Sequence, residues 1–216
     1  LGVAPQATIR RMYFGPISDF FSRYGKMALL VLALVATYRI SDVIMGVMAN
    51  VFYIDLGFEK QEIGRISKGF GLIMIILGGF LGGLLTVRYG VMRVLFVGGL
   101  LAASTNLMFA VLDSMGNIVW MLMVVISADN LSAGIASAAF VAYLSSLTNR
   151  TFTATQYALF SSIMLLLPKL LAGYSGMVVD AIGYSTFFIL TAIIGVPVLF
   201  LILLVSRIRV LKHEIQ

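Results

Sequence analysis

The sequence predicts an all-α integral membrane protein folded as a six-helix bundle. Of its 216 residues, 61% are hydrophobic and 11% are charged, whereas soluble domains carry roughly 25% charged residues. The mean hydropathy is +1.05. Because a membrane-spanning helix needs about 20 mostly apolar residues, a chain of this length accommodates six spans with short loops. This leaves no room for a soluble catalytic domain.

The predicted elements follow one another in a simple order. Residues 1–25 are polar and basic and contain two prolines, which is typical of a cytosolic linker or of an amphipathic segment on the membrane surface. A six-transmembrane-helix bundle is expected over 26–206, followed by a cytosolic basic tail at 207–216. The apolar runs predict spans at 26–53, 63–87, 91–112, 118–147, 154–180 and 184–206.

The distribution of basic residues predicts the orientation of the spans, because Lys and Arg accumulate in cytoplasmic loops. One side of the predicted bundle collects Arg10, Arg11, Arg23, Lys26, Arg88, Arg93, Arg150, Arg207, Arg209 and Lys212. The other side has only Lys60, Arg65 and Lys68. Both termini of the chain are therefore predicted to be cytoplasmic, as an even number of spans requires.

Small residues are concentrated in two of the predicted spans. The second span contains Gly71, Gly78, Gly79, Gly82 and Gly83, and the fourth contains a Ser-, Ala- and Gly-rich stretch at 127–139. Small residues at G-x-x-x-G spacing let neighbouring membrane helices approach closely. Helix packing is one interpretation of both stretches, and contact of the exposed backbone with a substrate is the other.

Charged side chains deep in a membrane span are functional candidates, because their insertion costs about 2.5–3.5 kcal/mol each. Arg39 and Asp42 lie three residues apart in the first span, on one helix face within reach of each other. They form either a structural ion pair or a site in which Arg39 binds a substrate carboxylate while Asp42 orients the guanidinium.

Asp129 in the fourth span and Lys169 in the fifth are the other intramembrane charges. Asp129 has no cation within one turn on its own helix, and burial disfavours the charged form of a carboxyl. Asp129 is therefore a candidate for proton coupling, and Asp42 is the second candidate. The alternative is an interhelical ion pair between Asp129 and Lys169.

Lys169 follows Pro168, which predicts a kink in the fifth span because proline removes a backbone hydrogen bond. Lys169 shares a helix face with Ser162, Gly173 and Gly176, a stripe that suits a substrate path or a close helix contact. Further candidate substrate-binding residues are the amides Asn106, Asn130 and Gln156, and Tyr38. Each amide either binds sugar hydroxyls or forms hydrogen bonds between helices.

Several other classes of protein are disfavoured. The sequence has no G-x-x-x-x-G-K-[ST] phosphate loop and no cysteine, and its one histidine, His213, has no second ligand at metal-binding spacing. We expect no enzymatic activity, no metal and no cofactor. The net charge of +6 forms no basic stripe interleaved with aromatic residues, so no nucleic-acid partner is expected.

The turn GGLLTVRYGVMR (82–93) is similar to the loop between paired helices of the major facilitator superfamily. Three longer stretches are YRISD with MANVFYIDLGF (38–42 and 48–58), ADNLSAGIASAAFVAYLSSLTN (128–149) and FTATQYALFSS (152–162). These three stretches resemble the AmpG-type muropeptide permeases of that superfamily. The resemblance covers the chain from about residue 10 onward.

This resemblance implies the C-terminal six-helix half of a twelve-helix transporter in the bacterial inner membrane. Such a permease imports 1,6-anhydro-muropeptides (GlcNAc-anhydroMurNAc peptides) for cell-wall recycling by proton symport, with the proton gradient as its energy source. The expected partners are the lipid bilayer, the muropeptide and an N-terminal six-helix half that completes the substrate cavity. The alternatives are a major facilitator carrier of another organic anion and a non-transporting half-permease that acts as a membrane partner subunit.

Overall fold

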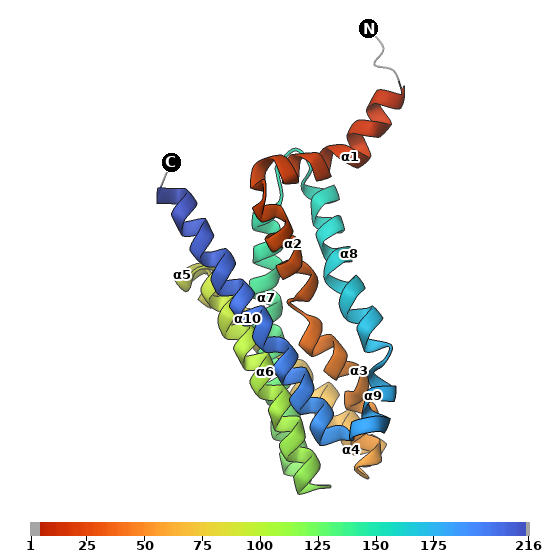
Figure 1. Cartoon of the computed structure of the whole chain (residues 1–216). Helices are drawn as coiled ribbons and strands as arrows, with labels where there is room; N and C mark the ends of the chain where they lie inside the picture. Colours follow the sequence, from red (N-terminus) through yellow and green to blue (C-terminus); the bar gives the residue numbers. More distant parts are fainter. Residues whose placement is uncertain (1–4, 215–216) are drawn as a thin grey trace.

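The computed structural model describes residues 5–214, and the side chains of 14–208, as an assembly of helices without a strand (Figure 1). The helices in order are α1 (Pro5–Tyr24), α2 (Met27–Thr37), α3 (Ile40–Asp55), α4 (Lys60–Arg65), the π-helical segment η1 (Ile66–Gly71), α5 (Leu72–Tyr89), α6 (Val91–Met115), α7 (Val119–Leu147), α8 (Thr153–Ala172), α9 (Ser175–Ile182) and α10 (Tyr184–Glu214).

These helices provide six segments that are long and apolar enough to cross a membrane: Met27–Asp55, Lys60–Tyr89, Val91–Met115, Val119–Leu147, Thr153–Ile182 and Tyr184–Ile208. Every boundary lies within three residues of the prediction. The six-helix membrane bundle is therefore confirmed. The described ends of the chain, α1 and the last turns of α10, lie at the same end of the bundle (Figure 1).

Two of the six spans are interrupted, the first near its middle and the fifth about two thirds of the way along. The first is broken between α2 and α3 at Arg39, whose φ of −94° and ψ of 7° lie outside the helical region. The fifth is broken between α8 and α9, at Gly173 and Tyr174. Pro168, where a kink is predicted, lies inside α8, which continues to Ala172.

The glycines of the second span divide into two sets. A Cβ added to Gly82 would lie 2.7 Å from Cα of Ile135 on α7, and Gly78 approaches the backbone of α7 even more closely. A Cβ on Gly79 or Gly83 would meet nothing within 4 Å. The packing interpretation is therefore confirmed for Gly78 and Gly82, which allow α5 and α7 to pack backbone to backbone.

The second and fifth spans share less of their surface with the bundle than the others do. In their most apolar stretches, 17% and 22% of the residues are buried, against 39–44% in the other four spans. Large apolar side chains such as Phe80 on α5 and Leu166 on α8 are 71% and 63% exposed. Both helices therefore present an apolar face outward, to lipid or to other protein.

The segment before the first span is a helix that packs on the end of the bundle. The last half of α1 crosses the ends of α2 and α8 (Figure 1), and its buried Phe20 contacts Phe160 of α8 with ring centroids 5.1 Å apart. At the other terminus, α10 continues through the predicted tail as far as Glu214. Residues 1–4 and 215–216 of the predicted terminal segments lie outside the described residues.

Candidate functional site

The break in the first span positions the Arg39–Asp42 pair. Arg39 Nε lies 3.3 Å from Asp42 Oδ2, so the ion pair predicted from the spacing is present. Arg39 Nη1 also donates a hydrogen bond of 2.6 Å to Ser137 Oγ on α7. The two charged side chains are 24% and 18% exposed. The Arg39 guanidinium is thus held through Nε and Nη1, and part of its surface remains accessible to a ligand.

Asp129 belongs to the same cluster of charges. Its Oδ1 accepts a hydrogen bond of 3.2 Å from Thr105 Oγ1 on α6, and both Asp42 and Arg39 are close enough to act on it electrostatically. Asp129 lies about two helical turns before Ser137 on α7, and Ser137 contacts Arg39 of the first span. We call Arg39, Asp42 and Asp129 the charged cluster.

The predicted ion pair between Asp129 and Lys169 is absent, although both residues are described. Lys169 lies on the outward face of α8 and is exposed. It lines a shallow groove of about 320 Å³ with Ser162, Leu165, Leu166 and Leu170. The prediction was wrong because it required α8 to turn Lys169 toward α7, and the packing of α8 on α2 and α3 turns it away.

Asn106 lies in the core and joins three helices. Its Nδ2 donates hydrogen bonds to Ser41 Oγ (2.8 Å) on α3 and to Thr191 Oγ1 (3.2 Å) on α10. Ser41 Oγ donates in turn to the Thr191 carbonyl oxygen (2.7 Å). The Asn106 side chain has no exposed surface. These contacts match the interhelical interpretation of Asn106, and they leave no path to a substrate in this conformation.

Asn130 and Tyr38 are also held by the protein itself. Asn130 Nδ2 donates to the carbonyl oxygen of Ile126 on its own helix (2.8 Å) and packs against Gly71 at the end of η1. The Tyr38 hydroxyl donates to the Leu95 carbonyl oxygen (3.1 Å). Its ring stacks on Phe140 with centroids 4.5 Å apart. Neither side chain joins the charged cluster through a hydrogen bond.

Gln156 at the start of α8 lies in a buried network with α1. Its side-chain oxygen accepts hydrogen bonds from Arg23 Nη2 (3.2 Å) and from the backbone N–H of Asn149 (2.7 Å). Its amide nitrogen donates to the Pro16 carbonyl oxygen (2.9 Å) and to Asp19 Oδ2 (2.9 Å). These four bonds use both acceptor and both donor positions of the amide. None remains for the substrate contact predicted for Gln156.

Asp19 is the acidic centre of this network. It also accepts hydrogen bonds from Asn149 Nδ2 (2.8 Å) and from Arg23 Nε (2.9 Å). Partial burial alone raises the pKa of the Asp19 carboxyl, but the hydrogen bonds from Gln156, Asn149 and Arg23 outweigh burial and hold this pKa below its usual value. We refer to Asp19, Arg23, Asn149 and Gln156 as the linker network.

The sequence prediction missed most partners of these site residues. Ser137 and Thr105 lie in long apolar helices where small hydroxyl residues are common, so nothing in the sequence distinguishes them. Asp19 and Arg23 are spaced four residues apart, a weak signal that they share a face of α1. Their long-range contacts depend on how α1 folds back on the bundle.

The chain is similar to known membrane transporters over most of its length. No protein-family model matches it. It is 35% identical over 188 residues to a Rickettsia conorii protein named as transporter AmpG 4, a match that covers 87% of this chain and 45% of that protein. It is 32% identical over 197 residues to the anhydromuropeptide permease of Escherichia coli K12, covering 91% of this chain and 40% of the permease.

A Rickettsia bellii protein named as transporter AmpG 1 is 30% identical over 196 residues, which cover 90% of this chain and 48% of that protein. The chain thus spans a little under half the length of the curated relatives it matches. The matched part includes the residues around the charged cluster, because it extends over about nine tenths of the chain. The chain is a multi-pass membrane protein that is similar, over about nine tenths of its length, to AmpG transporters and to an anhydromuropeptide permease.

Proposed function

We propose that this chain is the C-terminal six-helix half of a proton-coupled permease that imports 1,6-anhydro-muropeptides for cell-wall recycling. The observation that carries the proposal is the charged cluster inside a bundle whose relatives include an anhydromuropeptide permease. Ionisable groups within membrane helices are costly to insert and mark substrate or ion pathways. A permease with such a cluster needs no cofactor other than the proton gradient.

Arg39 is the proposed anchor for the substrate. Muropeptides carry carboxylates, and a guanidinium binds a carboxylate through paired charge-assisted hydrogen bonds. Ser137 and Asp42 hold the guanidinium in place, which reduces the conformational freedom that Arg39 loses when substrate binds. Asp42 in this role is a positioning residue.

Asp129 is the proposed proton acceptor. With Asp129 charged, the single cation of the charged cluster faces two carboxylates, and the field at Arg39 opposes an anionic substrate. Protonation of Asp129 removes one negative charge, so Arg39 binds a substrate carboxylate more strongly. Proton and substrate therefore favour each other's binding, as symport requires.

The ends and outward faces of the bundle support the proposed orientation and the proposed partner. The α5–α6 and α7–α8 connections, with Arg88, Arg93 and Arg150, lie at the same end as α1, which supports cytoplasmic termini in the bacterial inner membrane. The outward faces of α5 and α8, and the greater length of the relatives, support an N-terminal six-helix half as partner. Substrate then lies between the halves near the midplane.

Uptake into vesicles that contain the intact permease tests this proposal. Labelled 1,6-anhydro disaccharide-peptide is supplied with and without an imposed proton gradient, to wild type, Asp129→Asn and the control Asp180→Asn. We expect gradient-stimulated uptake by wild type and the control, and no stimulation in Asp129→Asn. Equal uptake with and without the gradient contradicts proton coupling, and an unaltered Asp129→Asn variant removes this residue from the mechanism.

A carrier of another organic anion is the second candidate, because the Arg39 contacts recognise a carboxylate without selecting a sugar. Competition distinguishes the two. If unlabelled anhydro-disaccharide peptide suppresses uptake and simple organic anions do not, the muropeptide is the substrate. The reverse pattern favours the second candidate.

A further inference from the structure

The hydroxyl group of Thr105 has two acceptors within reach but only one hydrogen to donate. Its Oγ1 lies 3.2 Å from Asp129 Oδ1 on α7 and 3.0 Å from the carbonyl oxygen of Ala102, one turn earlier on α6. A threonine hydroxyl carries a single hydrogen and two lone pairs. Thr105 therefore donates to one of the two oxygens at any moment, and its own oxygen is free to accept a hydrogen bond.

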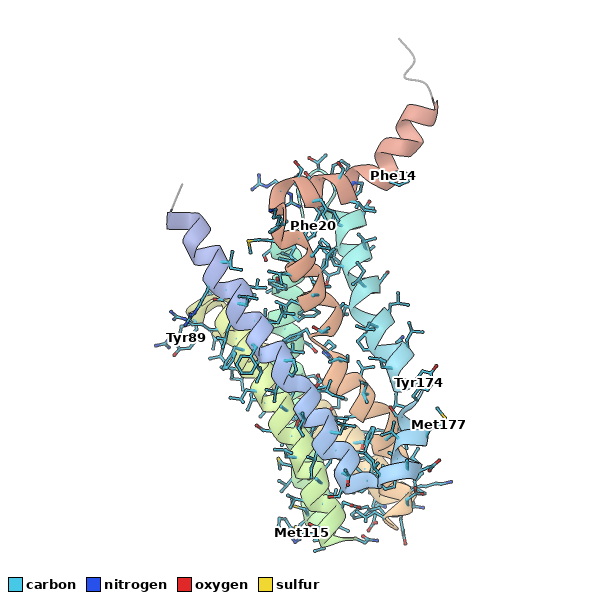
Figure 2. The ribbon with its side chains drawn as sticks, in the orientation of Figure 1. Phe14, Phe20, Tyr89, Met115, Tyr174 and Met177 are labelled. Atoms are coloured by element: carbon cyan, nitrogen blue, oxygen red, sulfur yellow. The ribbon has the colours of Figure 1, made fainter. Side chains whose placement is uncertain are left out.

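Thr105 is the hydrogen-bond partner of an ionisable group deep in the bundle. Among the described residues, it is the one whose side chain forms a hydrogen bond with the Asp129 carboxyl group. Thr105 is 5% exposed. It lies ten residues before Met115, the last residue of α6, which is at the opposite end of the bundle from Phe20 (Figure 2). At about 1.5 Å per residue, roughly 15 Å of helix separates Thr105 from that end.

The packing of α6 on α7 fixes the spacing of the two side chains. A Cβ added to Gly98 on α6 would lie 2.9 Å from Cα of Ala136 on α7, so the two backbones are in close contact here. Thr105 follows Gly98 by seven residues, and Asp129 precedes Ala136 by seven. This is about two turns along each of two antiparallel helices. The close backbone contact thus holds Thr105 beside Asp129.

The other groups that face Asp129 come from the first span. Arg39, Asp42 and the Tyr53 hydroxyl are close enough to interact with it electrostatically. Within the described part of the chain, none of the three forms a hydrogen bond with Asp129. The charged residues of the elements that pack on α7 are exposed or lie in a terminal turn of their helix: Lys68, Arg88, Arg93, Asp113 and Lys169. Hydrogen bonding to Asp129 therefore depends on Thr105.

We propose that Thr105 is a positioning residue that forms a hydrogen bond with both protonation states of Asp129 by turning its hydroxyl group. With Asp129 charged, Thr105 donates its hydrogen to Oδ1. When a proton adds to Oδ1, the new Asp129 O–H donates to Thr105 Oγ1, and the threonine hydrogen turns to the Ala102 carbonyl oxygen. The O–H of Asp129 is the only covalent bond that forms or breaks. The inference rests on the proposed function only in taking Asp129 as the proton acceptor.

Infrared difference spectroscopy of the intact permease in membranes tests the proposal. The carboxylic C=O band that appears on acidification and is absent in Asp129→Asn belongs to protonated Asp129. We expect this band to move to higher frequency in Thr105→Val, which keeps the shape of threonine without its hydroxyl group, and to stay in place in Thr105→Ser. An Asp129 band that is unmoved in Thr105→Val overturns the proposal.

Ser104→Ala is the matched control for these variants. Ser104 precedes Thr105 on α6 but is exposed, and its hydroxyl donates to the Leu100 carbonyl oxygen of the same helix. The change removes a hydroxyl group at the same depth without altering a contact of Asp129. We expect the Asp129 band to be the same in Ser104→Ala and in the wild type. A band that moves equally in Ser104→Ala and Thr105→Val contradicts a specific role of Thr105.

Transport of labelled 1,6-anhydro disaccharide-peptide gives a second readout. Net uptake requires Asp129 to bind and release a proton in every cycle, whereas exchange of labelled for unlabelled substrate requires no release. Thr105→Val removes a hydrogen bond to the charged carboxylate, and hydrogen bonds to charged groups are the stronger ones. At equal amounts in the membrane, we expect net uptake about tenfold lower in Thr105→Val, exchange close to wild type, and recovery of net uptake in Thr105→Ser. Equal loss of uptake and exchange, or no recovery in Thr105→Ser, marks a purely structural role and contradicts the proposal.

The infrared result separates this inference from the proposed function. If the Asp129 band is present but identical in wild type and Thr105→Val, the inference fails while Asp129 remains a proton acceptor. If no band depends on Asp129, the proton acceptor of the proposed function is wrong and the inference fails with it. If the band moves as expected in a permease that takes up no muropeptide, the proposed substrate is wrong and the inference stands.

Discussion

The side-chain amide of Gln156 on α8 donates a hydrogen bond of 2.9 Å to the carboxylate of Asp19 on α1, across 137 positions of sequence. This contact places the linker helix on the end of the membrane bundle. Gln156 belongs to the stretch FTATQYALFSS (152–162), and in this structure its side chain attaches α1 to the start of α8.

Replacing Gln156 by Leu is expected to release α1 from the bundle. The change leaves the Asn149 N–H and the Pro16 carbonyl without their partners, and each buried unsatisfied group costs about 1–3 kcal/mol. The measurement is trypsin cleavage after Arg23 in detergent, expected to accelerate in Gln156→Leu. Gln61→Leu, an exposed glutamine of α4, is the control. If the cleavage rate is unchanged and uptake is weakened, Gln156 contacts the substrate as the sequence predicts, and it does not hold α1 in place.

The linker network is expected to fail at low pH. The folded-state pKa of Asp19 lies below the usual 3.8, so the stability that this carboxylate contributes is fully present above the unfolded pKa. It is lost as the pH falls through the lowered folded pKa. Docking of α1, followed by a fluorophore on the linker, should thus be constant from neutral pH to about pH 5 and weaken below about pH 4. Loss of docking near pH 6 would require another titrating group.

The Arg39–Asp42 pair is expected to be more than a structural ion pair. Arg39→Gln alone leaves a partly buried carboxylate uncompensated, which destabilises by up to about 3–5 kcal/mol. Arg39→Gln combined with Asp42→Asn should regain thermal stability, measured by size-exclusion chromatography after heating, and still show no uptake. If the double variant recovers both stability and uptake, the pair is architectural.

The α5–α7 contact is expected to tolerate no side chain at Gly82. A methyl group there meets the backbone of Ile135, and overpacking costs about 1–3 kcal/mol. Gly82→Ala should therefore lower the melting temperature of the bundle. Gly83→Ala, one position along and facing open space, should leave it unchanged. Equal melting of the two variants would mean that the helices separate readily here.

The sequence was sufficient for the features that depend on local periodicity. Hydropathy located the six spans, and the three-residue spacing of Arg39 and Asp42 identified their ion pair. The sequence was insufficient for side-chain contacts that depend on how one helix is rotated about its own axis relative to its neighbours. Lys169 is on the expected helix, but the rotation of α8 is set by contacts spread over α2 and α3. The break of the fifth span at Gly173 and Tyr174 was likewise not predicted.

The interruptions of the first and fifth spans lie side by side, since Ser175 Oγ, just after one break, donates to the Ile44 carbonyl oxygen (3.3 Å), just after the other. Each of these spans therefore consists of two straight helices joined at a break. The second helices of the two spans, α3 and α9, are in contact with each other. Bending concentrates where helical hydrogen bonding is weakest. Ser41 on α3 is in turn bonded to Asn106 and Thr191, so a bend at either break would be shared by α3 and α9 and passed to the core of the bundle.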